Sequence, residues 1–467
     1  MPGVTPRVTP GVTPGVTPRV TLIHPCLGRR AGEKQGLRTW QMQPLWAAAL
    51  AALTPREVEL RFHDDRLEKI PFDEPTGLVG ISVETYTARR AYQIASEYRR
   101  RGVPVVMGGI HATLCPEEVA GYAESVVTGE AEETWPLLVD DFLHGRMAKF
   151  YRAGNGAVHP AWRYDRSIFR GRRYLPVRLI EFGRGCRLTC EFCAVQTAFH
   201  NTYTQRPVDD VVAEVAATSA SGDRAKLIFF VDDNLACEAE RLKEFLRALV
   251  PLRVGWVGQA GINVAHDPEL LDLIVRSGCR CLLIGFESLQ PDNLREMSKP
   301  INAVHGGIER AVAELRRYHV PVYGTFVFGC DADTADDFQR TVEFTVDHGF
   351  LLAAFAHLMP FPGTALHRRL AREGRLLQEA WWLDPGYAYN TVAFQPRHLA
   401  PEQLRRECLA ARRQFFSWPS MLRRSVTAGA RQRDFWTVNL LHRAELGLRD
   451  GHPLGDQAWE QPLLMTR

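Results

Sequence analysis

The sequence predicts an α/β protein with three parts: an N-terminal doubly wound parallel sheet, a partial (β/α)6 barrel and a helical C-terminal region. Three observations lead to this prediction. Short apolar runs alternate with helical stretches from residue 20 to about residue 370, which is typical of parallel sheets. Glycine or polar residues follow nearly every apolar run, at the carboxyl ends where such sheets bind ligands. A short loop with three cysteines follows the strand that opens the second half.

The composition is that of a globular protein from a reducing compartment. The 467 residues suffice for two or three domains, and hydrophobic and charged contents of 45% and 24% are ordinary. A net charge of +3 is too small to indicate a nucleic-acid partner, and no apolar run is long enough to span a membrane. Ten cysteines without a disulfide-like framework favour a cytoplasmic protein.

The first 19 residues differ from the rest of the chain. Gly-Val-Thr-Pro repeats from Gly3, and a proline at every fourth position blocks both helices and central strands. We expect residues 1–19 to form a disordered low-complexity tail.

Residues 20–145 are expected to form a first domain around a five-stranded parallel sheet. Each expected strand is a short apolar or alternating run, and longer helical stretches separate the strands. The expected strands are 20–24, 58–62, 78–83, 103–109 and 126–130, with helices at 42–53, 88–101 and 132–143. Residues 146–176 are rich in aromatic residues and arginine and are expected to be a connector.

Residues 177–370 are expected to form the partial barrel, with six βα units. The expected strands are 177–182, 226–231, 254–259, 281–286, 322–328 and 352–357, with helices such as 238–249, 268–277 and 304–318. Residues 371–467 are helical and rich in aromatic residues. This C-terminal region would either cap the barrel mouth or pack as a third helical core.

The most informative motif is the cysteine triple Cys186, Cys190 and Cys193, with the spacing C-x3-C-x2-C. Ordinary four-iron clusters use four cysteines, so three thiolates would leave one iron open to bind a substrate or cosubstrate. A zinc site would need a fourth ligand, for which His200 could serve. Three buried structural cysteines within eight residues would be poor core patterning. The spacing therefore favours an open four-iron cluster.

Polar side chains follow the expected barrel strands. Asp232, Asp233 and Asn234 end the second strand, Gln259 follows the third, and Glu287 follows the fourth. Because these strand ends share one rim of a barrel, the side chains are candidates for ligand binding. Helix capping is the alternative for Asp233 and Asn234, since Asp and Asn are favoured at helix N-termini.

The cysteine spacing, with the aromatic Phe192 before the last cysteine, resembles the signature of the radical S-adenosylmethionine (SAM) superfamily. The resemblance implies a 4Fe-4S cluster on the three cysteines, whose open iron is chelated by SAM, with Phe192 near the adenine. It implies a 5′-deoxyadenosyl radical and an external electron donor of flavodoxin or ferredoxin type. It also implies that polar residues at the strand ends contact SAM, namely Asp232, Asp233, Asn234, Gln259 and Glu287.

The strand ends of the first domain resemble those of the cobalamin-binding domain that is fused to many radical SAM enzymes. The similar stretches are Gly108-Gly-Ile-His-Ala-Thr113 and Gly129-Glu130, which border the nucleotide tail of the corrinoid in that family. The resemblance implies a cobalamin site made from three strand ends, with the residues Ser82, Glu84, Thr85, Gly108, Gly109, His111, Thr113, Gly129 and Glu130.

The first domain departs from that family in the loop after its first strand. Many cobalamin domains carry Asp-x-His-x-x-Gly there, and the histidine ligates cobalt from below, but this loop reads His24-Pro-Cys-Leu-Gly. We therefore expect cobalt to lack a protein imidazole below it, unless His63 or His111, which lie near strand ends, supplies one. A degenerate domain without the cofactor is the alternative.

The two resemblances together imply a cobalamin-dependent radical SAM enzyme over about residues 20–370. We expect a methyltransferase that acts on an unactivated carbon of a small molecule or lipid in a biosynthetic pathway. One alternative is a radical cyclisation or rearrangement enzyme of the same superfamily. The other is a noncatalytic iron–sulfur protein, which would need four protein ligands.

Overall fold

The computed structural model describes residues 17–31, 33, 41–154, 163–220, 227–303 and 306–465. The chain divides into two compact units. The first unit contains residues 1–173 together with 382–389 and 452–467, and the second contains residues 174–381 and 390–451. The tail expected at residues 1–19 lies, up to residue 16, outside the described residues.

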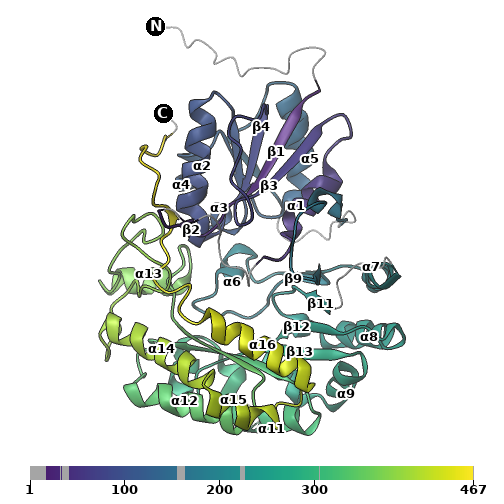
Figure 1. The fold of residues 1–467 in the computed structure, drawn as a ribbon, viewed down its shortest axis with the longest axis vertical. Helices are drawn as coiled ribbons and strands as arrows, with labels where there is room; N and C mark the ends of the chain where they lie inside the picture. The colour runs from purple at the N-terminus through teal and green to yellow at the C-terminus, as the bar shows by residue number, and fades with distance from the viewer. Residues whose placement is uncertain are drawn as a thin grey trace. The chain divides into compact units, whose positions relative to one another are not determined.

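The first unit is built on a doubly wound parallel sheet, as predicted (Figure 1). Its six strands lie in the order β3-β1-β4-β5-β6-β7, and every neighbouring pair is parallel. They are β1 Arg19–His24, β3 Glu59–Asp64, β4 Leu78–Ser82, β5 Val105–Gly108, β6 Ser125–Thr128 and β7 Phe150–Arg152. The prediction of five strands was wrong by one, because β7 pairs with β6 from within the expected connector. A strand of 3 residues is too short to show a hydrophobic period in the sequence.

Helices cover both faces of this sheet (Figure 1). They are α1 Leu45–Leu53, α2 Ala88–Arg100, α3 Ile110–Leu114, α4 Pro116–Ala120 and α5 Ala131–Leu143. Trp135 of α5 is 2% exposed, and its indole N–H donates to Thr54 Oγ1 at 3.0 Å, which ties α5 to the end of α1. Arg90 of α2 forms a buried ion pair with Asp65 at 2.8 Å, which ties α2 to the loop after β3.

The second unit contains the predicted six-stranded parallel sheet, in the order β15-β14-β13-β12-β11-β8. The strands are β8 Val177–Ile180, β11 Leu227–Phe230, β12 Trp256–Ala260, β13 Cys279–Glu287, β14 Val322–Phe328 and β15 Leu352–His357. Between them lie α7 Val208–Ala220, α8 Ala239–Leu249, α9 Pro268–Arg276, α10 Pro291–Glu296, α11 Gly307–Arg317 and α12 Ala335–Asp347, and α13 Ala365–Arg372 follows β15. Phe286, Phe326 and Phe355 stack in its core, with ring centroids 5.6 and 6.0 Å apart. Because all the strands are parallel, their carboxyl ends form one rim.

Three helices of the C-terminal region belong to the second unit: α14 Pro401–Phe415, α15 Trp418–Ser425 and α16 Gln432–Glu445. Arg424 of α15 is fully buried and donates to the backbone oxygens of Phe350, Leu351 and Phe415. Among the described helices, none is both long and apolar enough to cross a membrane.

Two other segments of the C-terminal region belong to the first unit, residues 382–389 and 452–467. β16 Gly455–Asp456 pairs in parallel with β2 Gly28–Arg29. The side chain of Gln93 on α2 makes two hydrogen bonds with the backbone of Asp456, of 2.8 and 3.1 Å. The sequence predicts one continuous C-terminal region over residues 371–467. Neither segment has a hydrophobic period that would indicate its packing against the first unit.

Candidate active site

The cysteine loop lies after β8, at the carboxyl rim of the second unit. An antiparallel ribbon of β9 Gly183–Gly185 and β10 Tyr203–Gln205 frames it, and α6 Ala194–Ala198 follows the last cysteine. Cys190 is buried, while Cys186 and Cys193 are half-buried. The backbone N–H of Cys193 donates to Cys190 O at 3.1 Å, so the C-x2-C part forms a tight turn. His200, the alternative zinc ligand, is exposed.

The three thiols lie close enough to influence one another. Burial raises the pKa of Cys190 to about 11, with smaller contributions from Cys193 and Cys186. Burial also raises the pKa of Cys193. Cys186 differs, because a hydrogen bond from the thiol of Cys237 lowers its pKa to about 6. Three neighbouring thiols of this kind fit an iron cluster, since bound metal removes the cost of forming thiolates at a buried site.

Two carboxylates that follow β11 hold the backbone that leads into the cysteine loop. Asp232 is 2% exposed and accepts the backbone N–H of Phe182 at 3.0 Å and that of Gly183. Burial raises the pKa of Asp232 well above its usual range. Asp233 accepts the N–H of Gly185 at 2.9 Å, and burial raises its pKa to about 6. Both residues therefore shape β9 whether or not a ligand is bound.

Asn234 and Gln259 belong to the same network. Asn234 Oδ1 accepts the N–H of Ala236 at 3.1 Å, which is the predicted capping role, and also that of Gly261 at 2.9 Å. The amide nitrogen of Asn234 lies 3.8 Å from Sγ of the first cysteine of the motif. Gln259 Nε2 donates to the backbone oxygen of Asp233 at 2.9 Å. Capping thus explains one contact of Asn234 and leaves its amide nitrogen at the cysteine loop.

Glu287 lies at the carboxyl end of β13 and forms a buried ion pair with Lys299. The backbone of Glu287 has a φ of +64°, at a bulge where β13 shifts register against β14. Sequence reasoning did not single out Lys299, because it lies in the turn after α10 and only the fold returns it to the rim. Phe192 is half-buried and packs against the hydrophobic core of the barrel.

The structure brings the predicted residues of the first unit together at the carboxyl ends of β4, β5 and β6. Gly129 N donates to Thr113 Oγ1 at 3.0 Å, which joins the segments after β6 and β5. Nδ1 of His111 lies 3.2 Å from Thr85 Oγ1, which joins the segments after β5 and β4. The other predicted residues occupy the same three strand ends, namely Ser82, Glu84, Gly108, Gly109 and Glu130.

Gly109 shows how tightly the backbone is packed at these strand ends. Its φ is +96°, and a Cβ at this position would lie 2.9 Å from Ser82 Oγ and from the backbone N and O of Val83. Only glycine fits such a close approach without strain. The strand ends therefore present backbone rather than side chains, which suits the binding of a large ligand such as a corrinoid.

His111 is fully buried, and both of its ring nitrogens have partners. Nε2 lies 3.1 Å from Glu118 Oε1, and Glu118 also accepts the indole N–H of Trp382 at 3.1 Å. Ligand atoms of His111, Cys115 and Glu118 lie within 4.8 Å of one another, as in a metal site. Hydrogen bonds already account for the histidine and the carboxylate, so this group is a structural network. His111 would have to break this network to ligate cobalt.

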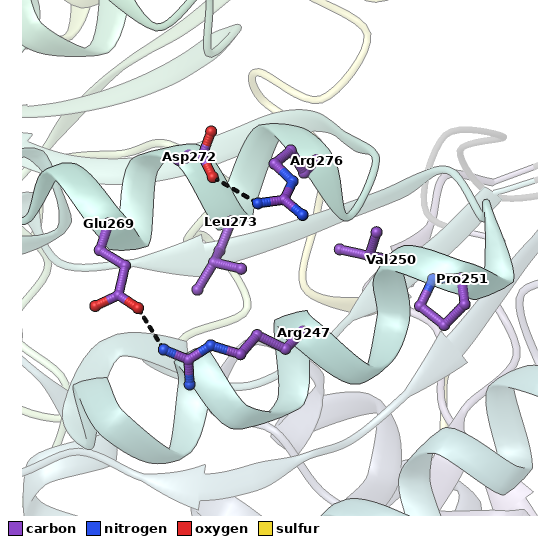
Figure 2. A pocket seen from close by; sticks show the side chains of 7 residues that line it. All are labelled: Arg247, Val250, Pro251, Glu269, Asp272, Leu273 and Arg276. Atoms are coloured by element: carbon purple, nitrogen blue, oxygen red, sulfur yellow. Dashed lines mark hydrogen bonds and ion pairs between the residues drawn. The ribbon is translucent and has the colours of Figure 1, made fainter.

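Figure 2 shows a pocket of the second unit that contains none of the predicted site residues. It lies between α8 and α9 and is lined by Arg247, Val250, Pro251, Glu269, Asp272, Leu273 and Arg276. Arg247 pairs with Glu269, and Arg276 pairs with Asp272 at 3.1 Å. Because these charges neutralise one another within the pocket, we assign it no part in the active site.

Two family models match the regions that carry these features. The model of the radical SAM superfamily matches residues 180–345, and that of the B12 binding domain matches residues 40–139. The chain therefore contains a radical SAM domain and a B12-binding domain. The two kinds of domain and the fold class predicted from the sequence are confirmed.

Two proteins similar to this radical SAM protein are named as methyltransferases. It is 28% identical to bacteriochlorophyllide d C-12(1)-methyltransferase of Chlorobaculum tepidum, over 90% of this chain and 96% of the relative. It is 27% identical to bacteriochlorophyllide d C-8(2)-methyltransferase of the same organism, over 82% of this chain and 88% of the relative. A similar solved structure is TsrM from Kitasatospora setae with cobalamin and a 4Fe-4S cluster bound, with a TM-score of 0.60, 19% identity and coverage of 86% of this chain and 85% of that chain.

This radical SAM protein is therefore an enzyme, and its cofactors are a 4Fe-4S cluster, SAM and cobalamin. The residues fit these groups: three thiols on one loop shift one another's pKa, as neighbouring iron ligands would, and close-packed backbone at the strand ends suits a corrinoid. The assignment of individual residues to each cofactor stays a prediction.

Proposed function

We propose that this enzyme transfers a methyl group from SAM, by way of cobalamin, to an unactivated carbon of a small molecule. One observation carries the proposal: the three-cysteine loop and the B12-binding sheet occur in the same chain. Two relatives that match 90% and 82% of the chain support it, since both are named as methyltransferases. A flavodoxin or ferredoxin is the proposed electron donor.

The thiolates of Cys186, Cys190 and Cys193 are proposed to ligate three irons and to leave the fourth open for SAM. When bound, the cluster would supply the electron that cleaves SAM, and cobalamin would carry the methyl group. Asp232 has an indirect role in this proposal. Its oxygens accept two backbone N–H groups, so it fixes the strand before the cysteines instead of contacting SAM.

Four rim residues are proposed to contact SAM: Asp233, Asn234, Gln259 and Glu287. A carboxylate with little access to water suits the ammonium group of SAM, because opposite charges attract strongly where water is excluded. Asp233 and Glu287 are the two carboxylates of this set. Phe192 is proposed to pack against the adenine, since stacked aromatic rings attract each other beyond the effect of burial.

Cobalamin is proposed to bind at the carboxyl ends of β4, β5 and β6, through the hydroxyl groups and backbone of the strand-end segments. Because His111 is held by Thr85 and Glu118, we propose that no protein imidazole lies below cobalt. The electron paramagnetic resonance spectrum of bound cob(II)alamin should then lack nitrogen splitting from a histidine. Nitrogen splitting that disappears in His63→Ala or His111→Ala would contradict this geometry.

We propose a tetrapyrrole as the substrate class to test first. The support is that both relatives, matched over 96% and 88% of their lengths, are named for bacteriochlorophyllide d. A polycyclic lipid is the second class to test, because a protein 24% identical over 72% of this chain is named as hopanoid C-2 methylase of Rhodopseudomonas palustris.

Anaerobic turnover with SAM that carries a labelled methyl group tests the function. The protein is reconstituted with iron, sulfide and hydroxocobalamin, supplied with a reductant, and offered bacteriochlorophyllide d or a polycyclic lipid. We expect a product that carries one labelled methyl group, together with 5′-deoxyadenosine and S-adenosylhomocysteine, by mass spectrometry. The matched control, Cys190→Ala, should give none of the three.

Two outcomes would contradict methyl transfer. Formation of 5′-deoxyadenosine with a modified but unmethylated product would favour radical cyclisation or rearrangement. A protein that holds an iron–sulfur cluster but never cleaves SAM would favour the noncatalytic alternative.

A further inference from the structure

A buried lysine lies beside the cysteine loop in the second unit. Lys299 is 7% exposed, and its ammonium group pairs with Glu287 and donates to Gly285 O at 3.1 Å. The turn that carries Lys299 is attached to the cysteine loop, because the backbone N–H of Glu191 donates to Met297 O at 3.0 Å. The lysine is therefore held on two sides, by the end of β13 and by the cysteine loop.

The backbone around this ion pair is shaped to let the two side chains meet. Asn302 Nδ2 donates to the backbone oxygens of Gly285 and Phe286, at 2.9 and 2.8 Å. Glu287 adopts a φ of +64°, which is uncommon for a residue with a side chain. A Cβ on Gly285 would collide with the Glu287 carboxylate and would lie 2.7 Å from Lys299 Nζ. At the ion pair, β13 therefore contains a strained residue, Glu287, and a glycine, Gly285, where a side chain would collide with the pair.

Lys299 keeps its positive charge although it is buried. Burial alone would lower the pKa of Lys299, but the ion pair with Glu287 opposes burial, and the pKa lies above its usual value. The lysine therefore stays protonated, in a place where little water screens its charge.

We propose that Lys299 raises the reduction potential of the iron–sulfur cluster, and that its partner Glu287 lowers it. This inference rests on the proposed assignment of the cluster to the three cysteines. Reduction adds a negative charge to a centre that thiolates already make negative, so a nearby ammonium group favours the reduced state and a nearby carboxylate disfavours it. The pair would thus set how easily the electron donor can reduce the cluster.

Redox titration of the reconstituted protein without substrate, followed by electron paramagnetic resonance, tests the inference. Lys299→Met should shift the midpoint potential of the cluster to more negative values, and Lys299→Arg should stay close to wild type because it keeps the charge. Glu287→Gln should shift the potential to more positive values. Loss of packing alone would not move the two variants in opposite directions, so the opposite signs identify a charge effect.

Lys243→Met is the matched control. Lys243 is also buried, at 6% exposure, and its partners are the carboxylates of Glu240, Asp267 and Glu269. Lys243→Met removes one buried positive charge, as Lys299→Met does, but it leaves the surroundings of the cysteine loop unchanged. The potential of the cluster should therefore equal that of the wild type.

Iron and sulfide analysis distinguishes failure of this inference from failure of the proposed function. A wild-type protein without a cluster, or one whose cluster survives replacement of all three cysteines, would refute the proposed function as well as this inference. Normal iron content in Lys299→Met with the wild-type potential would overturn the inference alone. If Lys299→Met does not load a cluster, Glu287→Gln decides: an unchanged or more negative potential overturns the inference.

Discussion

Individual carboxylates at the barrel rim differ in what they can still bind. Asp232 has both oxygens engaged by backbone N–H groups, so replacing it would disturb the strand before the cysteines. Asp233 uses one oxygen for Gly185, and Glu287 uses one for Lys299. A carboxylate that uses one oxygen for such a contact can accept a further hydrogen bond with the other oxygen and keep the first contact. This difference makes Asp233 and Glu287 better candidates for ligand contact than Asp232.

Replacement of Cys186, Cys190 or Cys193 with alanine should abolish stable cluster binding, because two thiolates are too few to hold the cluster. Iron and sulfide analysis of the reconstituted variants measures this. Cys237→Ala is the matched control, since its thiol hydrogen-bonds to Cys186 but lies outside the motif. Normal iron content in all three motif variants, or its loss in the control, would show that other ligands hold the metal.

Asp333 should make the stability of the apoprotein depend on pH. Its carboxylate is 2% exposed, and burial raises its pKa from 3.8 to about 7, although it accepts the N–H groups of Gly329 and Cys330. Because the pKa is higher in the folded protein, protonation favours folding. Its contribution is greatest below the unfolded pKa and is lost as pH rises through the folded pKa.

Between pH 4 and 7, wild type should therefore lose up to about 4 kcal/mol of unfolding free energy relative to Asp333→Asn, which has no proton to lose. Urea titrations at several pH values measure this difference. Parallel curves for the two proteins would mean that the carboxylate titrates normally when folded.

At the level of elements, length decided what the sequence could predict. β13 and β14 have 9 and 7 residues, and their apolar runs are visible without a structure. β7, β9 and β10 have 3 residues each, and β2 and β16 have 2, so their pairing depends on contacts far along the chain. The same contrast applies to the site. The cysteines were predictable because their spacing is itself the signal, whereas Lys299 lies in a polar turn that only the fold brings to the rim.

Arg424 should be the residue that most stabilises the packing of α15. Its guanidinium group donates to three backbone oxygens that have little access to water, so Arg424→Met should cost about 3–5 kcal/mol of unfolding free energy. Arg423→Met is the matched control. The Arg423 side chain is 65% exposed and pairs with Asp347 at 3.0 Å, so its loss should cost less than about 1 kcal/mol. Urea denaturation measures both, and equal costs would refute the structural role of Arg424.

At the level of the whole molecule, the B12-binding unit is assembled from three separate stretches of chain. Trp382 donates to Glu118, and Leu383 O accepts from Arg89, so residues 382–389 contribute to it directly. Residues 452–465 add β16 and a hydrogen bond from Leu464 N to Ser96 on α2 at 2.8 Å. This unit is therefore not a self-contained N-terminal domain.

Truncation of the chain after residue 451 should loosen the first unit, because β2 and α2 lose their C-terminal partners. Hydrogen exchange followed by mass spectrometry should show faster exchange in α2 and around β2. β13 and β14 serve as the internal control and should exchange as in the full chain. Unchanged protection of α2 would mean that the C-terminal segment contributes little to its stability.

The pairing of β2 with β16 also sets an order of assembly. His452 donates to Gly28 O, and 424 positions separate the two residues in the sequence. The whole of the second unit lies between them in the sequence. The ribosome synthesises the parallel sheet of the first unit early. The strand β2 can pair with β16 only after the barrel and its last helices have been translated. The part of the protein that is synthesised first is thus completed last. The corrinoid meets its finished binding unit only after translation has reached the C-terminal segment.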